Sequence, residues 1–270
     1  MLIADYHTHS SFSQDSDEPM EKMVISAINL GLKEIAFTDH LDYDYADPEF
    51  TFLLDINDYA KSFEKLKNKY KDKIKLLAGV EIGLQPHLKE KNINFSKCYD
   101  FDFIIASTHT TDRKDFYNGD FFIGKTQKNA YLRYFEDVLE NILVHKELNF
   151  NVYGHLDYIN RYGNYDNKIL NYMDFKNIID EILKTLISCE KGIELNTSGF
   201  RYGLNQTHPQ PEILKRYKEL GGEILTVGSD AHKAADIFAD FDKAYQIIKS
   251  AGFNYITLFE QQKPRFEKIL

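Results

Sequence analysis

Short, nearly continuous apolar runs alternate along this chain with longer stretches in which apolar residues recur every three or four positions. Continuous apolar runs are typical of parallel strands buried on both faces, and the longer spacing is typical of amphipathic helices. The strand candidates span residues 2–7, 34–40, 74–83, 101–109, 151–155, 192–198 and 223–232. The helix candidates span residues near 18–30, 56–72, 127–148, 174–190, 209–220 and 236–251.

The order of these elements indicates an α/β fold with a parallel sheet. Seven strand candidates that alternate with helices favour a closed or nearly closed barrel, with an open doubly wound sheet as the alternative. We find no repeat, no tract rich in Pro, Gly or Ser, and no shift in composition across the 270 residues. The prediction is therefore one domain that spans residues 1–270.

The composition is that of an ordinary globular protein, with 43% hydrophobic and 28% charged residues. Its 33 basic and 42 acidic side chains give a formal net charge of −9, which repels phosphate backbones and argues against a nucleic-acid partner. No apolar stretch has the length of a membrane span, and the start lacks the basic region of a signal peptide. We therefore expect a cytoplasmic protein with no membrane partner, whose oligomeric state the sequence does not indicate.

Nine histidines stand out against only two cysteines, Cys98 and Cys189. The cysteines are too few and too far apart for a disulfide framework or a thiolate zinc site. A metal site in this chain would therefore use imidazole and carboxylate ligands, which suit zinc, iron or manganese.

Most of the histidines lie where a strand candidate ends. In a β/α barrel the carboxyl ends of the strands form the active face, so these side chains are expected to converge. Within the sequence His-Thr-His, the imidazoles of His7 and His9 point to the same side of an extended strand. The convergent set includes two carboxylates and consists of His7, His9, His40, Glu81, His109, His155, Asp230 and His232. Three histidines do not follow the pattern and are interpreted as background: His87, His145 and His208.

Three charged residues near the same strand ends are candidates for substrate binding. Arg161 and Arg201 lie in predicted loops that follow strands on the active face. A guanidinium there could hold phosphate oxygens through two parallel hydrogen bonds, and a surface salt bridge is the competing interpretation for each. Asp42, two residues after His40, is the third candidate.

The segment from Gly119 to Thr126 reads GDFFIGKT and satisfies the P-loop pattern of nucleotide triphosphatases. A phosphate-binding loop follows a buried strand directly, whereas the polar segment TTDRKDFYN intervenes here. We therefore reject the P-loop and predict that Phe121 and Phe122 pack at the mouth of the site while Thr126 caps a helix.

Six short motifs carry a resemblance that extends along nearly the whole chain. HTHS (7–10), FTDH (37–40), GVE (79–81), STH (107–109), YGHLD (153–157) and GSDAH (228–232) resemble, in order and spacing, the motifs of the PHP phosphoesterases. Within that superfamily the chain most resembles the histidinol-phosphate phosphatases. The resemblance implies a distorted (β/α)7 TIM-like barrel with a trinuclear metal centre at the carboxyl ends of the strands. The residue pattern by itself supports a barrel and several metals.

The resemblance also implies a ligand set for two or three divalent ions (Zn, Mn or Fe). The first metal would bind His7, His9, Glu81 and Asp230, and Glu81 would bridge to a second metal held by His109 and His155. A third metal would use His40 and His232. Many relatives have another histidine after the first motif, where this chain reads SFSQDSDE, and Asp15 is the nearest candidate to replace it.

The implied activity is hydrolysis of a small phosphate monoester, preferably L-histidinol phosphate to L-histidinol and phosphate in histidine biosynthesis. A metal-bridging hydroxide would attack phosphorus while Arg161 and Arg201 neutralise the phosphoryl oxygens. Asp230 is our candidate to pass a proton to the leaving oxygen; Asp42 could do so instead or contact the substrate amine. Loops 43–55 and 110–125 are expected to recognise the rest of the substrate.

Other functions are compatible with the same centre, because a barrel does not determine its reaction. One alternative is a PHP phosphoesterase that acts on nucleotides or another metabolite phosphate, and another is an amidohydrolase-like cleavage of a C–N bond. The net charge of −9 disfavours an exonuclease. A third alternative is a metal- or phosphate-binding regulatory module without turnover, which the complete set of candidate ligands disfavours.

Overall fold

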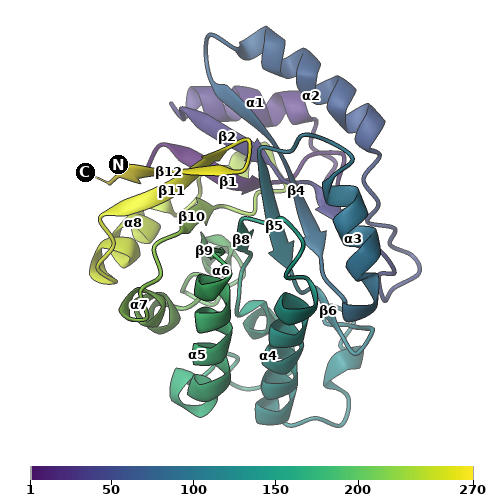
Figure 1. Cartoon of the computed structure of the whole chain (residues 1–270), viewed down its shortest axis with the longest axis vertical. Helices are drawn as coiled ribbons and strands as arrows, with labels where there is room; N and C mark the ends of the chain where they lie inside the picture. Colours follow the sequence, from purple (N-terminus) through teal and green to yellow (C-terminus); the bar gives the residue numbers. More distant parts are fainter. Residues whose placement is uncertain (1, 270) are drawn as a thin grey trace.

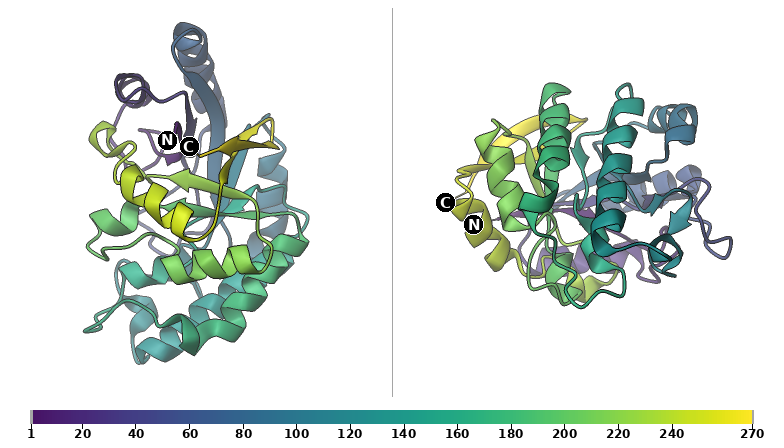
Figure 2. Two further views of the ribbon diagram at one scale, coloured as in Figure 1. Left: turned by 90° about the vertical axis from the view of Figure 1, so that its left-hand side faces the viewer. Right: turned by 90° about the horizontal axis from the view of Figure 1, so that it is seen from below.

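The computed structural model describes residues 2–269, with a parallel sheet at its centre and helices around it (Figure 1, Figure 2). Within these residues, seven parallel strands are neighbours in the order in which they occur along the chain. They are β1 (Ala4–Thr8), β2 (Glu34–Phe37), β4 (Lys75–Gly83), β5 (Phe103–Ser107), β8 (Val152–Tyr153), β9 (Gly192–Asn196) and β10 (Leu225–Gly228). The short strand β3 (His40–Leu41) follows β2 and also pairs with β4.

The sheet curves until its first and last strands meet. The backbone N–H of Asp230 donates to the carbonyl of His7 (2.8 Å), and the N–H of His9 donates to the carbonyl of Ala231 (2.8 Å). Thr8 and Ala231 form a parallel bridge at the same place. The barrel is therefore nearly closed, which confirms the predicted distorted (β/α)7 architecture.

Six helices match the predicted helical stretches and surround the strands: α1 (Met20–Asn29), α2 (Ile56–Tyr70), α4 (Gln127–Val144), α5 (Tyr172–Ser188), α7 (Pro211–Glu219) and α8 (Phe241–Ser250). Polar side chains cap several of their first turns, as where Asp55 accepts the N–H of Asn57 at the start of α2. The stretch predicted to be helical from residue 236 becomes an α-helix only at Phe241. Phe238 and Asp240 adopt left-handed φ values of 62° and 59°, which an α-helix excludes.

Several elements were not predicted. Helix α3 (Lys89–Ser96) is too polar to show an apolar face, and α6 (Ser198–Arg201) is a single turn. The short strands β6 (Thr110–Thr111) and β7 (Lys114–Asp115) form a small hairpin, and the 3₁₀ turns are η1 (Pro86–Leu88), η2 (Asp120–Phe122), η3 (Tyr158–Arg161) and η4 (Ala234–Asp236). A second hairpin joins β11 (Tyr255–Glu260) to β12 (Lys263–Lys268) through Gln261 and Gln262. Both of these turn residues have positive φ. In most tight hairpins Gly or Asn occupies such positions, so the sequence contains no indication of this turn.

The β11–β12 hairpin covers the amino ends of the barrel strands. The Tyr6 hydroxyl accepts the N–H of Phe259 (2.8 Å) and donates to Glu34 (2.8 Å), and the rings of Phe103 and Phe259 lie 5.3 Å apart. Apolar and aromatic side chains thus fill this end, and polar residues gather at the opposite, carboxyl end. No helix between residues 2 and 269 combines the length and the apolar character that crossing a membrane requires.

Candidate metal centre

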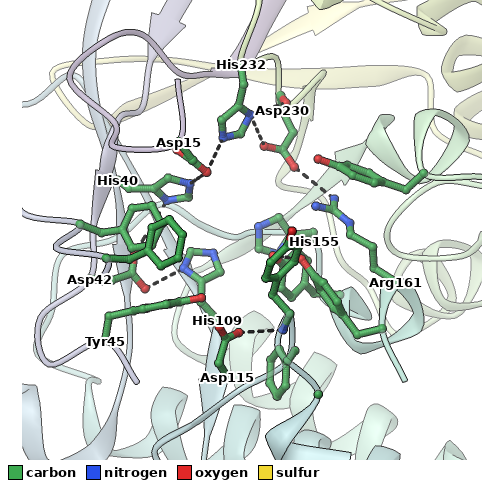
Figure 3. Close-up of a pocket in the computed structure, with 18 of the residues that line it drawn as sticks. Asp15, His40, Asp42, Tyr45, His109, Asp115, His155, Arg161, Asp230 and His232 are labelled. Atoms are coloured by element: carbon green, nitrogen blue, oxygen red, sulfur yellow. Dashed lines mark hydrogen bonds and ion pairs between the residues drawn. The ribbon is translucent and has the colours of Figure 1, made fainter. Parts of the chain in front are cut away.

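The side chains predicted as metal ligands converge at the carboxyl end of the barrel. Figure 3 shows those that line the pocket: Asp15, His40, His109, His155, Asp230 and His232. Strands β1, β3 and β4 contribute His7, His40 and Glu81, and the segments just after β1, β5, β8 and β10 supply the others. Among the described residues, candidate ligand atoms form groups of three that lie within 4.8 Å of one another. These groups are His7–His9–Asp230, His7–Glu81–His155, His9–His40–His232 and His40–Asp42–His109.

Glu81 lies at the middle of this cluster and is fully buried. Its Oε2 is 3.1 Å from Nε2 of His7 and 3.1 Å from Nδ1 of His40. Its Oε1 is 2.9 Å from Nε2 of His155 and 3.2 Å from Nε2 of His109. Because each carboxylate oxygen faces at least two imidazoles, Glu81 is placed where one side chain can bridge two cations.

Two further carboxylates complete the cluster. Oδ1 of Asp230 lies 3.4 Å from Nε2 of His9 and 3.6 Å from Nδ1 of His232. Oδ2 of Asp15 lies 3.1 Å from Nε2 of His232 and 3.6 Å from Nε2 of His40. Asp15 therefore lies against the two histidines with which the resemblance groups it.

Hydrogen bonds orient the imidazoles from behind. Nδ1 of His7 is 2.7 Å from Oε1 of Glu194, and Nδ1 of His9 is 3.1 Å from the hydroxyl of Ser13. Ser13 donates its own proton to Asp39 (2.9 Å), so its oxygen accepts from His9. Because a carboxylate only accepts, Nδ1 of His7 carries a proton, and Nε2 of the same ring faces Glu81 within the cluster (3.1 Å).

The cluster suits a divalent cation. Three of its buried nitrogens, Nε2 of His9, Nδ1 of His40 and Nε2 of His232, lie near carboxylate oxygens but form no well-oriented hydrogen bond in the described part of the chain. Burying a polar atom without a partner is costly, and a coordinated cation would remove that cost. Neutral imidazoles with carboxylates are also the donor set that zinc, manganese and iron share.

The charges of the cluster shift its pKa values in opposite directions. Burial by itself lowers the pKa of His109, but the carboxylates of Asp42 and Glu81 outweigh burial and raise it to about 9. For His9, burial and the neighbouring imidazoles act together and lower the pKa. Burial tends to raise the pKa of Glu81, but the surrounding imidazoles outweigh it and hold this pKa well below its usual range. Glu81 is therefore an anion at neutral pH.

Both predicted arginines face the same pocket. The guanidinium of Arg161 lies 4.6 Å from the ring centroid of Tyr158 and 3.9 Å from that of Tyr202, and its Nη2 is 3.2 Å from Oδ2 of Asp230. Nη2 of Arg201 donates to the backbone carbonyl of Asp230 (2.8 Å). Within residues 2–269, Nε of Arg161 and Nη1 of Arg201 are buried without a hydrogen-bond partner. These N–H groups are available to an anion.

A cavity of about 980 Å³ opens over the cluster and the arginines. Aromatic side chains form much of its wall, several of them from the two loops expected to recognise substrate: Tyr45, Phe50, Phe52, Phe116, Tyr117, Phe122, Tyr158, Tyr162 and Tyr202. Two carboxylates line it beside these rings: Asp115 from the second loop, and Asp42, which immediately precedes the first. Oδ1 of Asp42 is 2.7 Å from Nδ1 of His109, and its Oδ2 is buried without a hydrogen-bond partner in the described chain.

Sequence reasoning missed the residues that support the cluster from behind. Glu194, Asn196 and Ser198 follow one another at alternate positions from β9 into α6, and Ser13 and Asp39 hold His9. The available signal was a glutamate within an otherwise apolar strand candidate, since a charge buried in a strand requires a partner.

The histidines interpreted as background lie outside the cluster. His87 is near the surface, 2.8 Å from Asp44, and Nδ1 of His145 donates to a backbone carbonyl (2.9 Å). His208 is buried, with Nδ1 2.5 Å from Asp157.

The P-loop-like segment serves as a wall of the cavity. Nζ of Lys125 donates to the carbonyl of Phe121 (2.6 Å) and lies over the Phe121 ring. The ammonium group of this lysine therefore binds within its own loop. Phe121 is buried and Phe122 lines the cavity. Thr126 accepts the N–H of Asn129 at the start of α4, as predicted.

Comparisons with known proteins agree with this geometry. Residues 5–198 match the family model described as the PHP domain. A histidinol-phosphatase of Lactococcus lactis subsp. lactis is 36% identical over 264 residues, which cover 97% of this chain and 96% of the relative. A probable histidinol-phosphatase of Clostridium acetobutylicum is 32% identical over 269 residues, which cover 98% of this chain and all of the relative. The crystal structure of histidinol phosphate phosphatase from L. lactis, complexed with zinc, L-histidinol and phosphate, is similar with a TM-score of 0.91 and 36% identity over 98% of this chain and 100% of that one.

Proposed function

Because the chain belongs to the PHP domain family, we propose that it is a metal-dependent phosphoric monoester hydrolase that converts L-histidinol phosphate to L-histidinol and inorganic phosphate. The observation that carries the proposal is one cavity that joins a His/carboxylate cluster to two arginines with unpaired N–H groups. The similar L. lactis protein, whose structure contains zinc, L-histidinol and phosphate, supports the same substrate here. The reaction belongs to histidine biosynthesis.

The cluster would hold two or three divalent cations. The first would be bound by His7, His9, Glu81 and Asp230, the second by Glu81, His109 and His155, and the third by His40, His232 and Asp15. When bound, such cations acidify water and neutralise negative charge on phosphoryl oxygens. Zinc is supported by the similar L. lactis structure, and manganese and iron satisfy the same donors.

The chain's own residues bind the phosphoryl group and move the proton. Nε of Arg161 and Nη1 of Arg201 donate to phosphoryl oxygens, and this positive charge is worth most where water is excluded. Nearby imidazoles and Arg161 outweigh the effect of burial and hold the pKa of Asp230 well below its usual range. Asp230 is thus ionised, and from its position in the cluster we propose that it accepts a proton from the attacking water and then delivers it to the leaving oxygen.

The rest of the cavity suits the leaving group. L-Histidinol phosphate carries an anionic phosphate at one end and an amine and an imidazole at the other. The arginines bind the phosphate. The carboxylates of Asp42 and Asp115, which lie among aromatic rings, bind the end with the amine and the imidazole. Aromatic faces pack against a flat ring and against cations, so this wall favours an imidazole-bearing amine over an uncharged alcohol.

The test is phosphate release from a panel of monoesters by purified protein of known metal content. We expect the highest kcat/KM for L-histidinol phosphate and much lower values for nucleoside monophosphates and short single-stranded DNA. Exhaustive chelation should abolish turnover, and added zinc or manganese should restore it. Full activity after chelation, or a preference for nucleotides, would contradict the proposal.

A pair of histidine variants gives a matched comparison. His9→Asn, within the cluster, should lower turnover by about 100-fold or more. His87→Asn, near the surface beside Asp44, should leave turnover and metal content unchanged. Equal effects of the two substitutions would remove the link between the cluster and the reaction.

A further inference from the structure

Three polar side chains lie at alternate positions where β9 ends and α6 begins: Glu194, Asn196 and Ser198, named here the β9 polar row. All three residues are at most 1% exposed. Alternate positions of an extended strand share one face, so Glu194 and Asn196 lie on the side of β9 that faces the cluster, and Ser198 follows at the start of α6. Buried polar side chains need partners, and the partners of this row connect two parts of the site.

The first link joins Glu194 to the metal cluster. Its Oε1 accepts from Nδ1 of His7 (2.7 Å), and its Oε2 accepts the backbone N–H of His155 (3.0 Å) and the side-chain amide of Asn196 (3.1 Å). An ionised carboxylate only accepts, so the NH₂ group of Asn196 must face Glu194. The amide oxygen of Asn196 therefore faces the other way, toward Ser198.

The second link joins Asn196 to Ser198. The amide oxygen of Asn196 accepts the backbone N–H of Ser198 (2.9 Å) and lies 2.5 Å from its hydroxyl. A hydroxyl has one proton, and this contact uses it. The hydroxyl oxygen of Ser198 is left as an acceptor, although Oδ2 of Asp230 also lies 3.2 Å away.

The third link reaches Arg161. Its Nη2 donates to the Ser198 hydroxyl at 2.6 Å, the shortest contact of this guanidinium, and lies 3.2 Å from Asp230. The rings of Tyr158 and Tyr202 flank the guanidinium, but rings restrain its plane and not its rotation within that plane. A directional acceptor at Nη2 sets that rotation and so fixes the direction of the unpaired Nε–H of Arg161, a residue that lines the pocket.

We propose that the β9 polar row positions the phosphate-binding guanidinium of Arg161 relative to the metal cluster. Ser198 is the positioning residue for Arg161. Glu194, which only accepts, determines which group donates and which accepts in each hydrogen bond of the row. This inference rests on the proposed function, in which Arg161 binds the phosphoryl group. It assigns Ser198 and Asn196 an effect on phosphate affinity without contact with phosphate.

The test is a double-mutant cycle with inorganic phosphate as the probe, measured by calorimetry on the zinc-loaded protein. Ser198→Ala should weaken phosphate binding about tenfold, since a charge-assisted hydrogen bond is lost, and should raise KM for the monoester more than it lowers kcat. In an Arg161→Ala background, Ser198→Ala should cause no further loss. Zinc content should match the wild type in each variant.

Two more variants separate positioning from general destabilisation. Thr197→Val removes a neighbouring hydroxyl that donates to the carbonyl of Ala239 and does not contact Arg161, so phosphate affinity should not change. Ser198→Cys replaces the hydroxyl with a slightly larger thiol, which is a weaker acceptor, and should lose affinity to an intermediate degree. This variant keeps the inference testable if the alanine variant does not fold.

The inference fails if Ser198→Ala and Ser198→Cys bind phosphate like the wild type, or if Ser198→Ala has the same effect with and without Arg161. Failure of the proposed function is a separate result. In that case the wild type releases no phosphate from monoesters, while the calorimetric cycle still reports whether Ser198 acts through Arg161.

Discussion

At the residue scale, the site depends on groups that lie behind the cluster and do not line the cavity. Glu194 hydrogen-bonds to Nδ1 of His7, and Ser13, itself bound to Asp39, hydrogen-bonds to Nδ1 of His9. Each imidazole therefore directs its Nε2 into the cluster. Hydrogen bonds of this kind raise the basicity of a metal-ligating histidine and restrict its rotation. The side chains behind the cluster therefore contribute to its affinity for cations.

Gly228 leaves the room that this arrangement needs. A Cβ at this position would lie 2.3 Å from both Oε1 of Glu194 and Cβ of His7. We predict that Gly228→Ala lowers the free energy of unfolding by about 2–3 kcal/mol and reduces the amount of bound zinc, because His7 and Glu194 must separate. Urea denaturation and elemental analysis measure the two effects.

Gly31→Ala is the matched control. No atom lies within 4 Å of a Cβ there, and φ is +78°, so its cost of about 1 kcal/mol comes from backbone strain alone. Bound zinc should not change in this variant. Equal zinc loss in the two variants would contradict the role given to the space at Gly228.

At the element scale, the helices depend on both apolar faces and specific polar contacts. Helices α5 and α7 are joined by Arg216, whose Nε and Nη2 donate to the two carboxylate oxygens of Asp180 at 2.9 and 2.8 Å. Lys176 is 2.6 Å from the same carboxylate. The hydrogen bonds from Arg216 and Lys176 outweigh desolvation and hold the pKa of Asp180 well below its usual range.

This lowered pKa predicts a pH dependence of stability. A carboxyl group whose pKa is lower in the folded state stabilises the fold above its unfolded pKa of about 3.9, and the contribution is lost as the pH falls toward the folded value. Asp180→Asn should therefore lower the free energy of unfolding by about 1 kcal/mol at pH 7 and by less at pH 3. Urea denaturation at the two pH values checks this.

Glu181→Gln on the same helix is the control for Asp180→Asn, because Glu181 is exposed. It should change stability little at either pH. A loss for Asp180→Asn that stays the same from pH 7 to pH 3 would mean that the carboxylate charge is not what joins the helices.

At the scale of the whole molecule, the net charge of −9 includes carboxylates that lie inside the barrel. Glu81 and Asp230 are buried at the cluster, with Asp15 beside them. Bound cations would neutralise this charge and leave a locally positive pocket in an acidic protein, which a phosphate dianion requires.

We therefore predict that zinc stabilises the whole fold. A ligand that binds only the folded chain at 100 times its dissociation constant stabilises it by about 2.7 kcal/mol per site, which raises Tm by several degrees for a protein of this size. Thermal unfolding of chelated and zinc-loaded protein measures the shift, and renewed chelation should reverse it. Identical Tm values would contradict a folded-state metal site.

Much of the fold could be predicted because it depends on local patterns. Buried strands and amphipathic helices repeat with different periods, so the barrel order was visible along the chain. The β11–β12 hairpin was not, because Gln261 and Gln262 carry no turn signal and acquire positive φ in the folded protein. Helix α3 was missed because it has few apolar residues to pack.

The sequence alone determined which side chains reach the active face. Parallel strands in a barrel end at one rim, so the position of a histidine at the end of a strand already places it there. The domain organisation and the roles of the individual ligands stay predictions, because the position of a residue at the end of a strand does not determine either of them.

Only the tertiary structure decided how those side chains are oriented. Glu194 meets His7 across 187 positions of chain, and the resulting hydrogen bond selects which imidazole nitrogen faces the cluster. The Ser198 contact that orients Arg161 likewise joins residues 37 positions apart. Periodicity records which face of an element is buried, whereas the donor or acceptor role of a buried group is set by the partner it meets after folding.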